Sequence, residues 1–201
     1  MNRLSIIMLT AVAAASCAGG GWTEAESRLI LEGDGIMRVL TVDNPEDSLV
    51  LRSKSSEMDA AALQAPEYEA LARRMVATVT DPSQDGVGIA GPQVGVLRRI
   101  VAVQRFDKEG EPFEVYPNIR ITAFRGVQEP GGEGCLSVPG RHGNVLRWRD
   151  IDIEYTSLAT MQDTVETVQG FTAVIFQHEC DHLDGILYTD KITDTPSEDL
   201  Q

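Results

Sequence analysis

Apolar residues recur at helical spacing in two separate segments of the chain. In the first segment, from Pro66 to Thr80, apolar side chains fall on one helical face, and Pro66 suits the first turn of a helix. The second segment, from about Gly170 to Leu183, is largely apolar, and Gly185 follows as the expected stop signal. The pattern therefore predicts one helix in the first half of the chain and one near its end.

Outside these two helices, several runs are typical of β-strands. Ile151–Tyr155 alternates between apolar and polar residues, and Thr164–Val168 is placed to pair back on it as a hairpin. Four further runs are interpreted as strands: Ile36–Leu40, Ile100–Val103, Glu114–Tyr116 and Ile119–Phe124. Strands that are grouped together between helices favour an α+β fold over alternating βαβ units.

The first residues of the chain are expected to be a leader. Asn2-Arg3 precede an apolar run, Leu4–Ala15, that is short for a bilayer span. Residues 1–17 are accordingly interpreted as a signal peptide, whose end, Ala14-Ala15-Ser16-Cys17, resembles a bacterial lipobox with a lipidated cysteine. The protein is therefore expected to be exported and anchored to the membrane. The alternative is an ordinary amphipathic N-terminus on a cytoplasmic protein.

The rest of the chain divides into three parts. Residues 18–35 carry glycine and acidic side chains without a sustained period, so they are interpreted as a linker, with Gly19-Gly20-Gly21 as a tether. Residues 36–193 form the predicted folded domain. Residues 194–201 form a short acidic tail.

Composition limits the kinds of partner that the protein can have. The chain has 201 residues with 42% hydrophobic content, which is enough for one domain with its own core. Its formal net charge of -14 repels the phosphate groups of nucleic acids, so nucleic acid is not an expected partner. With only 3 cysteines, the chain is not a disulfide-rich scaffold.

The second predicted helix carries a pattern that is typical of metal-dependent hydrolases. His178 and His182 are four residues apart, and this spacing puts both imidazoles on one helical face, where they can bind a single ion. Glu179 lies about 100° around the helix from His178. That position suits a general base that takes a proton from a metal-bound water and returns it to a leaving amine. The alternative is a surface helix with scattered polar residues.

A catalytic metal site needs a third protein ligand, and Cys135 is the best candidate. Downstream of His182 there is no further histidine, and no glutamate occurs before Glu198. A thiolate ligand favours Fe²⁺, Zn²⁺, Co²⁺ or Ni²⁺ over Mg²⁺ or Ca²⁺. A buried structural cysteine is the alternative. Cys180 projects about 200° from His178 on the helix, so it is expected to face the core, away from the metal.

Three separated segments together resemble the signature motifs of the peptide deformylase family. They are Gly86-Val87-Gly88-Ile89-Ala90-Gly91-Pro92-Gln93, Glu133-Gly134-Cys135-Leu136-Ser137 and Gln177-His178-Glu179-Cys180-Asp181-His182. They occur in the order of the family, and the resemblance covers about Ile36 to Thr193. It implies an α+β fold in which mixed or antiparallel β-sheets wrap around a central metal-binding HExxH helix, and a catalytic domain over residues 36–193.

The resemblance also implies an activity and a set of site residues. The family removes the formyl group from N-formylmethionyl peptides and nascent chains, with one Fe²⁺ ion per chain that Zn²⁺, Ni²⁺ or Co²⁺ can replace. Carried over by position, the metal ligands are Cys135, His178 and His182, and the catalytic residues are Glu179, Gln93 and Leu136. Gln93 through its side-chain amide and Leu136 through its backbone N–H would stabilise the oxyanion. Val87 and Gly88 would bind the substrate backbone.

Four further features are not explained by the roles that the family implies. Gly91 replaces an alanine that the family commonly has, and loss of this methyl group is expected to loosen the loop that carries Gln93. His142 has no assigned role and is interpreted as a rim residue or a plain loop histidine. Asp181 matches the third motif without a physical role. The short acidic C-terminus lacks the basic helix with which some family members dock on the ribosome.

Two other functions remain open at this stage. A binding protein would capture formyl peptides with little turnover, although such a protein has no need of a general base. A general metallopeptidase would cleave unformylated peptides. Measurements of binding and turnover on the same preparation distinguish the deformylase from a binding protein, and cleavage of an unformylated peptide would favour the metallopeptidase.

Overall fold

The computed structural model describes residues 20–33 and 35–193. The predicted leader, residues 1–17, and the predicted acidic tail, residues 194–201, lie outside the described residues. The helices are α1 (Glu24–Leu31), α2 (Pro45–Leu51), α3 (Ala60–Gln64), α4 (Pro66–Val79) and α5 (Gly170–Leu183), with 3₁₀ turns η1 (Gly91–Val94) and η2 (Tyr188–Asp190). The strands are β1 (Gly88–Ala90), β2 (Ile100–Gln104), β3 (Phe113–Pro117), β4 (Arg120–Cys135), β5 (Val138–Ser157) and β6 (Gln162–Gln169).

The strands form two separate antiparallel sheets. One sheet has the order β1-β2-β3 and the other β4-β5-β6, so β1 and β4 are both edge strands. The pair Cys135↔Val138 closes the long β4–β5 hairpin around a loop of two residues, Leu136 and Ser137. Ile153 of β5 pairs with Glu166 of β6, which confirms the predicted hairpin. Helices combined with antiparallel sheets confirm the expected α+β class.

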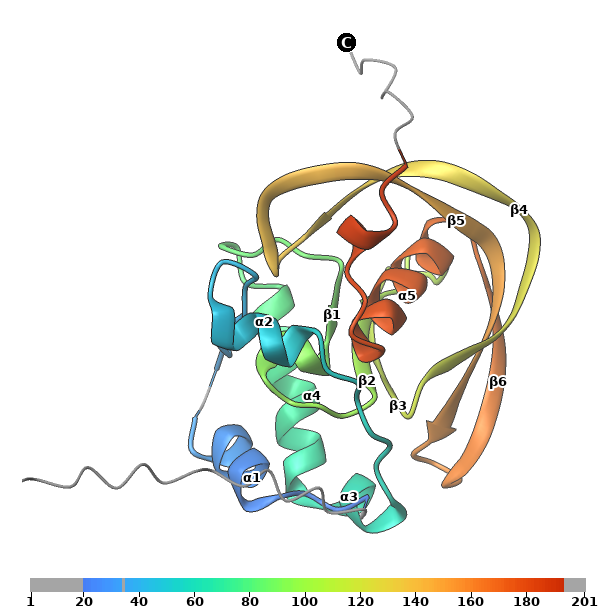
Figure 1. Ribbon diagram of the computed structural model, residues 1–201. Helices are drawn as coiled ribbons and strands as arrows, with labels where there is room; N and C mark the ends of the chain where they lie inside the picture. The colour runs from blue at the N-terminus through green and yellow to red at the C-terminus, as the bar shows by residue number, and fades with distance from the viewer. Residues whose placement is uncertain (1–19, 34, 194–201) are drawn as a thin grey trace, which may run out of the picture.

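The helix α5 lies at the centre of this arrangement. It contacts β1 and β2 of the first sheet and β5 and β6 of the second, and Figure 1 shows β4 and β5 curving over and around it. Phe176 and Leu183 are completely buried, as expected for a helix that is apolar on most sides. Gly185, with a φ of 73°, stops the chain from continuing as a helix. The polar residues of α5 are therefore held on a rigid, enclosed element.

The predicted linker over residues 18–35 is wrong for residues 24–31, which form α1. Thr23 and Glu26 form a reciprocal capping box at the start of this helix, an arrangement that satisfies two backbone donors. Ile30 is completely buried and belongs to the hydrophobic cluster around α4. The segment is therefore part of the folded domain.

The predicted glycine tether is likewise held against the domain where the structure describes it. The Gly20 carbonyl accepts a hydrogen bond from the Asp59 backbone N–H at 3.2 Å. Trp22 donates its indole N–H to the Ala62 carbonyl at 2.9 Å. The buried Arg98 guanidinium donates to both Glu26 carboxylate oxygens, at 2.7 and 2.8 Å, and to the carbonyls of Gly20 and Gly21. These contacts fix the chain from Gly20 onwards.

The predicted strand Ile36–Leu40 does not form. Residues 36–40 belong to no strand, and their hydrogen bonds go to a side chain and to the turn η1 instead of a neighbouring strand. The Met37 N–H donates to the Thr78 hydroxyl at 2.7 Å, and the Leu40 N–H donates to the Gln93 carbonyl at 2.8 Å. Side chains Met37 and Leu40 are buried, so the apolar pattern reflected burial and not sheet pairing.

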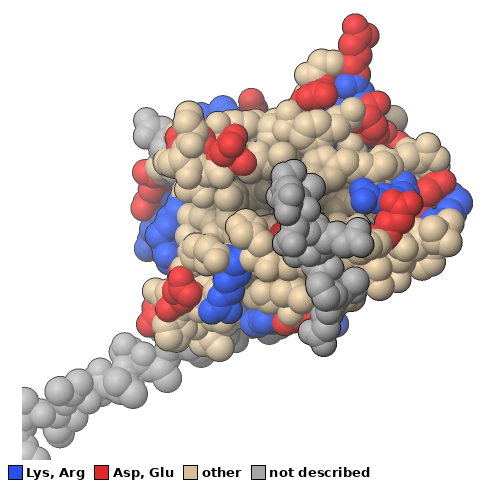
Figure 2. Space-filling model, turned by 90° about the horizontal axis from the view of Figure 1, so that it is seen from above, with Lys and Arg blue, Asp and Glu red and all other residues tan. Residues whose placement is uncertain are grey.

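The surface carries interspersed charges of both signs. Figure 2 shows acidic and basic side chains around the periphery of the upper face, with other residues in its middle. Among the described residues of this face, basic side chains alternate with acidic ones. Over residues 20–33 and 35–193, no helix has both the length and the apolar character needed to cross a bilayer.

Candidate active site

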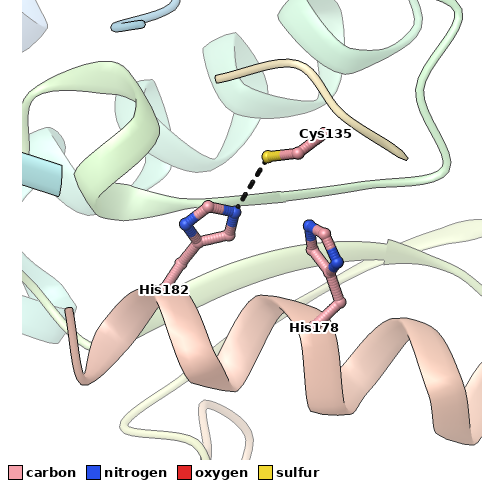
Figure 3. Close-up of side chains that lie close together, drawn as sticks. All are labelled: Cys135, His178 and His182. Carbon is pink, nitrogen blue, oxygen red and sulfur yellow. Dashed lines mark hydrogen bonds between the residues drawn. The ribbon is translucent and has the colours of Figure 1, made fainter. Parts of the chain in front are cut away.

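The structure brings Cys135, His178 and His182 together. Cys135 ends β4, and the two histidines lie one turn apart on α5. Their potential ligand atoms all lie within 4.8 Å of one another, and the Cys135 Sγ is 3.2 Å from the His182 Nε2. Figure 3 shows the three side chains pointing into one space between α5 and the end of β4. This is the cluster that the sequence predicted as a metal site.

A buried ionic network orients His178. The His178 Nδ1 lies 2.8 Å from a carboxylate oxygen of Glu133, which leaves Nε2 free to face the cluster. Arg147 donates to both oxygens of Glu133, at 2.7 and 3.0 Å, and to Asp181 at 2.6 Å. Asp181 also accepts from Lys191 at 2.6 Å. Asp181 thus has a structural role. Glu133 is placed as the carboxylate to which a metal-binding histidine commonly donates its second ring N–H.

Glu133 and Arg147 were not among the predicted site residues. Glu133 stands two residues before Cys135 in a strand, and residues at this spacing point to the same face of a sheet. That spacing was the available signal. Arg147 reaches Glu133 only through the register of the β4–β5 hairpin, which the sequence alone did not reveal.

The charge states of the cluster fit a divalent cation. Burial holds the pKa of His182 well below its usual value, so this imidazole is neutral and free to coordinate. Burial also acts to lower the pKa of His178, but interactions with Cys135 and Glu133 outweigh it and raise this pKa to about 10. Positive charge is therefore favoured next to the Cys135 sulfur. One sulfur and two imidazole nitrogens form a donor set that suits Fe²⁺, Zn²⁺, Ni²⁺ or Co²⁺.

Glu179 lies beside the cluster in a site from which water is largely excluded. Its side chain is buried, and burial raises its pKa to about 7. One carboxylate oxygen, Oε2, has no hydrogen-bond partner among the described residues. A Cβ atom on Gly88 would lie 2.5 Å from the other oxygen, Oε1, so the glycine permits the carboxylate to approach β1. A buried carboxylate with a raised pKa is well suited to proton transfer.

Gln93 and Leu136 place potential hydrogen-bond donors next to the same space. The Ala90 backbone N–H donates to the Gln93 Oε1 at 2.8 Å, which directs the Gln93 amide N–H₂ towards Cys135 and Ser137, at 3.6 and 3.2 Å. Leu136 sits in the two-residue loop after Cys135. Its backbone N–H has no backbone partner among residues 20–33 and 35–193. The Leu136 N–H is therefore available for a ligand, and the Gln93 amide lies at the same space with Cys135 and Ser137 as its present acceptors.

A pocket with a volume of about 350 Å³ opens above these residues. Its polar lining includes Gln93, Cys135, His178 and Glu179. Its apolar lining consists of Val87, Leu136, Phe171, Val174 and Ile175. The rest of the pocket lining comes from two segments. One is Gly86–Gly88 on the β1 side, and the other is Gly132–Gly134 on the β4 side. The structure thus brings all eight predicted site residues to one pocket or its immediate surroundings.

Comparison with known proteins now assigns the family. Residues 36–198 match the sequence model of the polypeptide deformylase family. The chain belongs to this family. The peptide deformylase of Leptospira biflexa is 33% identical over 167 residues, covering 80% of this chain and 89% of that protein. That of Desulforudis audaxviator is 40% identical over 144 residues, covering 72% of this chain and 88% of that protein.

Solved structures agree with this assignment. The class I type b peptide deformylase of Acinetobacter baumannii superposes with a TM-score of 0.69 at 32% identity, covering 79% of this chain and 100% of that one. The Thermotoga maritima peptide deformylase gives a TM-score of 0.68 at 28% identity, covering 80% of this chain and 99% of that one. The expected fold, with sheets around the HExxH helix, and the expected enzyme class are confirmed.

One expectation about this deformylase chain is wrong, and one is confirmed. A Cβ atom on Gly91 would lie 2.7 Å from the Val96 carbonyl oxygen and 2.8 Å from that of Arg98. Glycine therefore tightens this turn by close backbone packing and does not loosen it. Cys180 is free and buried in the core next to Phe176 and Leu183, as predicted.

Proposed function

We propose that this member of the family hydrolyses the formamide bond of N-formylmethionyl peptides and releases formate. The observation that carries the proposal is the meeting of the Cys135, His178 and His182 donor atoms within 4.8 Å, with the buried Glu179 beside them. The Cys135 thiolate and the imidazoles of His178 and His182 would hold a divalent cation and leave a coordination position open for water or substrate. We propose Fe²⁺ as the resident ion, with Zn²⁺, Ni²⁺ or Co²⁺ as functional replacements.

Each site residue has a role that follows from its position. Cys135, His178 and His182 would hold a divalent cation, which would supply Lewis acidity for the formyl carbonyl and for the attacking water. Glu179 accepts the proton from the attacking water and transfers it to the amine that leaves. The Gln93 amide and the Leu136 backbone N–H donate to the oxyanion that develops on the formyl oxygen.

The substrate backbone fits between two strand edges. The edge strands β1 and β4 belong to different sheets, and both border the pocket. An extended peptide can add to such edges through main-chain hydrogen bonds, with Val87 and Gly88 as its partners on β1. The apolar side chains of Phe171, Val174 and Ile175 then receive the first side chain. Among related structures, an Acinetobacter baumannii enzyme was solved with Met-Ala-Ser bound, and we extend that mode of binding to this chain.

Formate release from formyl-Met-Ala-Ser by anaerobically Fe²⁺-loaded protein tests the proposal. We expect turnover with the formyl peptide and none with acetyl-Met-Ala-Ser, because the acetyl group adds a methyl next to the reacting carbon. Stoichiometric binding of the formyl peptide without formate release would identify a binding protein instead. Cleavage of the unformylated peptide would identify a general metallopeptidase.

We also propose that the enzyme is exported and anchored through lipid on Cys17. The support is the leader pattern of residues 1–17 and the fixed start of the domain at Gly20, a few residues after the proposed lipid. Cell fractionation with labelled palmitate tests this location, with Cys17→Ser as the control. Unlabelled protein of full length in the cytoplasmic fraction would rule out the proposal and favour the cytoplasmic alternative.

A further inference from the structure

His142 stands at the rim of the pocket without an assigned role. It lines the pocket and is exposed, in contrast with the enclosed His178 and His182. Its ring lies over the backbone of Gly134, since a Cβ atom on this glycine would be 2.8 Å from the His142 Nδ1. No side-chain hydrogen bond ties the ring to another residue in the described part of the chain. The imidazole is thus placed at the pocket with both nitrogens free.

The strand β4 shows two different faces next to this ring. Glu133 points inward to Arg147 and His178. Its neighbours Gly132 and Gly134 belong to the opposite face, because side chains alternate along a strand. Neither glycine has a side chain, and a Cβ atom on Gly132 would meet nothing closer than Asn144 Oδ1 at 3.9 Å. The outer face of β4 is therefore bare backbone at Gly132, and the His142 ring covers it at Gly134.

A peptide bound along β4 would place alternate side chains on the inner and the outer face of this strand. The inference rests on the proposed function, in which an extended formyl peptide lies along β4. If its first side chain enters the apolar pocket beside Val174 and Ile175, its second side chain points outward. It then lies over Gly132, next to the His142 ring that covers Gly134.

We infer that His142 is a specificity-determining residue that favours a hydrogen-bond acceptor, Asn or Asp, as the second residue of the formyl peptide. An imidazole N–H can donate to a carboxamide or carboxylate oxygen at this place. The lining of the pocket also includes Asp85, whose charge disfavours Asp more than Asn as the second residue. Asn and Leu have nearly the same shape and no charge, so this pair of second residues isolates the hydrogen bond.

The test compares formyl-Met-Asn-Ser with formyl-Met-Leu-Ser on Fe²⁺-loaded enzyme. We expect the ratio of their kcat/KM values to fall about three- to tenfold in His142→Ala, the effect of one exposed hydrogen bond. His142→Gln retains an N–H donor and is expected to recover much of the ratio. The matched control is Arg141→Ala, which alters the exposed neighbour outside the pocket lining and is expected to leave the ratio unchanged.

A second readout separates this inference from the proposed function. Calorimetry with the products Met-Asn-Ser and Met-Leu-Ser measures the same preference without catalysis, and we expect the same order of variants. An unchanged ratio in His142→Ala, with normal formate release, overturns the inference and leaves the proposed function intact. Absence of formate release from either peptide overturns the proposed function, and the product affinities then decide the role of His142. A fall of equal size in Arg141→Ala would also overturn the inference.

Discussion

Two buried arginines contact α5, and only one of them reaches the active site. Arg147 is 3% exposed and pairs with Glu133 and Asp181. Arg105 is 1% exposed and pairs with Asp107, Glu114 and Glu166, with its guanidinium 5.7 Å from the Phe176 ring centroid.

The difference lies in what the carboxylate partners do besides pairing. Glu133 uses one oxygen for both Arg147 and His178, at 3.0 and 2.8 Å, so the ion pair is coupled to the metal cluster. The partners of Arg105 lie on β3, on β6 and in the loop after β2, where they connect elements of the scaffold. A buried ion pair by itself is weak evidence of a stabilising role. The ion pairs of Arg147 position the proposed metal ligand His178, whereas the ion pairs of Arg105 join strands of the scaffold.

The largest effect is expected at the carboxylate that has no arginine partner. Glu179→Gln removes the proposed proton acceptor, and kcat is expected to fall about 10²- to 10⁴-fold. The free energy of unfolding should rise at about pH 8, because the folded wild-type protein must keep a buried, incompletely paired carboxylate ionised. Formate assays and urea unfolding of the metal-free protein measure the two changes. Lower stability of the variant would show that the carboxylate is better paired than the structure indicates.

Replacing Glu133 tests the coupled ion pair. Glu133→Gln weakens the contacts to both Arg147 and His178, so metal affinity is expected to fall about ten- to hundredfold. Competition with a chelator, followed by metal analysis, measures this loss. Glu166→Gln is the matched control, because it alters a carboxylate partner of Arg105 and should leave metal affinity unchanged. Equal losses in the two variants would break the distinction between the two arginines.

Replacing Arg105 tests whether its ion pairs serve only the scaffold and not the metal site. Arg105→Leu should lower the free energy of unfolding by about 1–3 kcal/mol, less than for a fully buried unpaired charge, because the three carboxylates that remain are partly exposed and can be hydrated. Metal content and kcat/KM should stay at the wild-type values. Denaturant titration and metal analysis on one preparation check both statements. Loss of metal from this variant would show that the scaffold network also positions the site.

The parts of the fold that the sequence predicted well are those with a local signal. The helix predicted over Pro66–Thr80 forms at Pro66–Val79, and the helix predicted from about Gly170 to Leu183 has those bounds. In contrast, α1 has only 8 residues and depends on the distant Arg98, so no local period marked it. The strands β4 and β5 contain register shifts, which interrupt the alternation on which strand prediction relies.

The candidate site shows the same limit. Cys135, His178 and His182 could be chosen because they lie in short motifs with chemical meaning. The contact of Arg147 with Glu133 could not be predicted, because it depends on the register of the β4–β5 hairpin. Close approaches, such as that of Glu179 to Gly88, become visible only in three dimensions.

The smallest effect on stability is expected at Tyr188. This residue packs against His178 but does not take part in the polar network of Glu133, Arg147 and Asp181. Its ring stacks on His178 at 6.0 Å between centroids, and its buried hydroxyl has no hydrogen-bond partner in the described part of the chain. Tyr188→Phe keeps the ring and removes the hydroxyl, so the free energy of unfolding should rise by about 1 kcal/mol. Urea unfolding measures this gain, and metal affinity should not change. Tyr188→Ala, the contrasting variant, should lower both stability and metal affinity, because it removes the packing against His178. A loss of metal affinity in Tyr188→Phe would mean that the hydroxyl belongs to the network that positions His178. That network would then include Tyr188 in addition to Glu133 and Arg147.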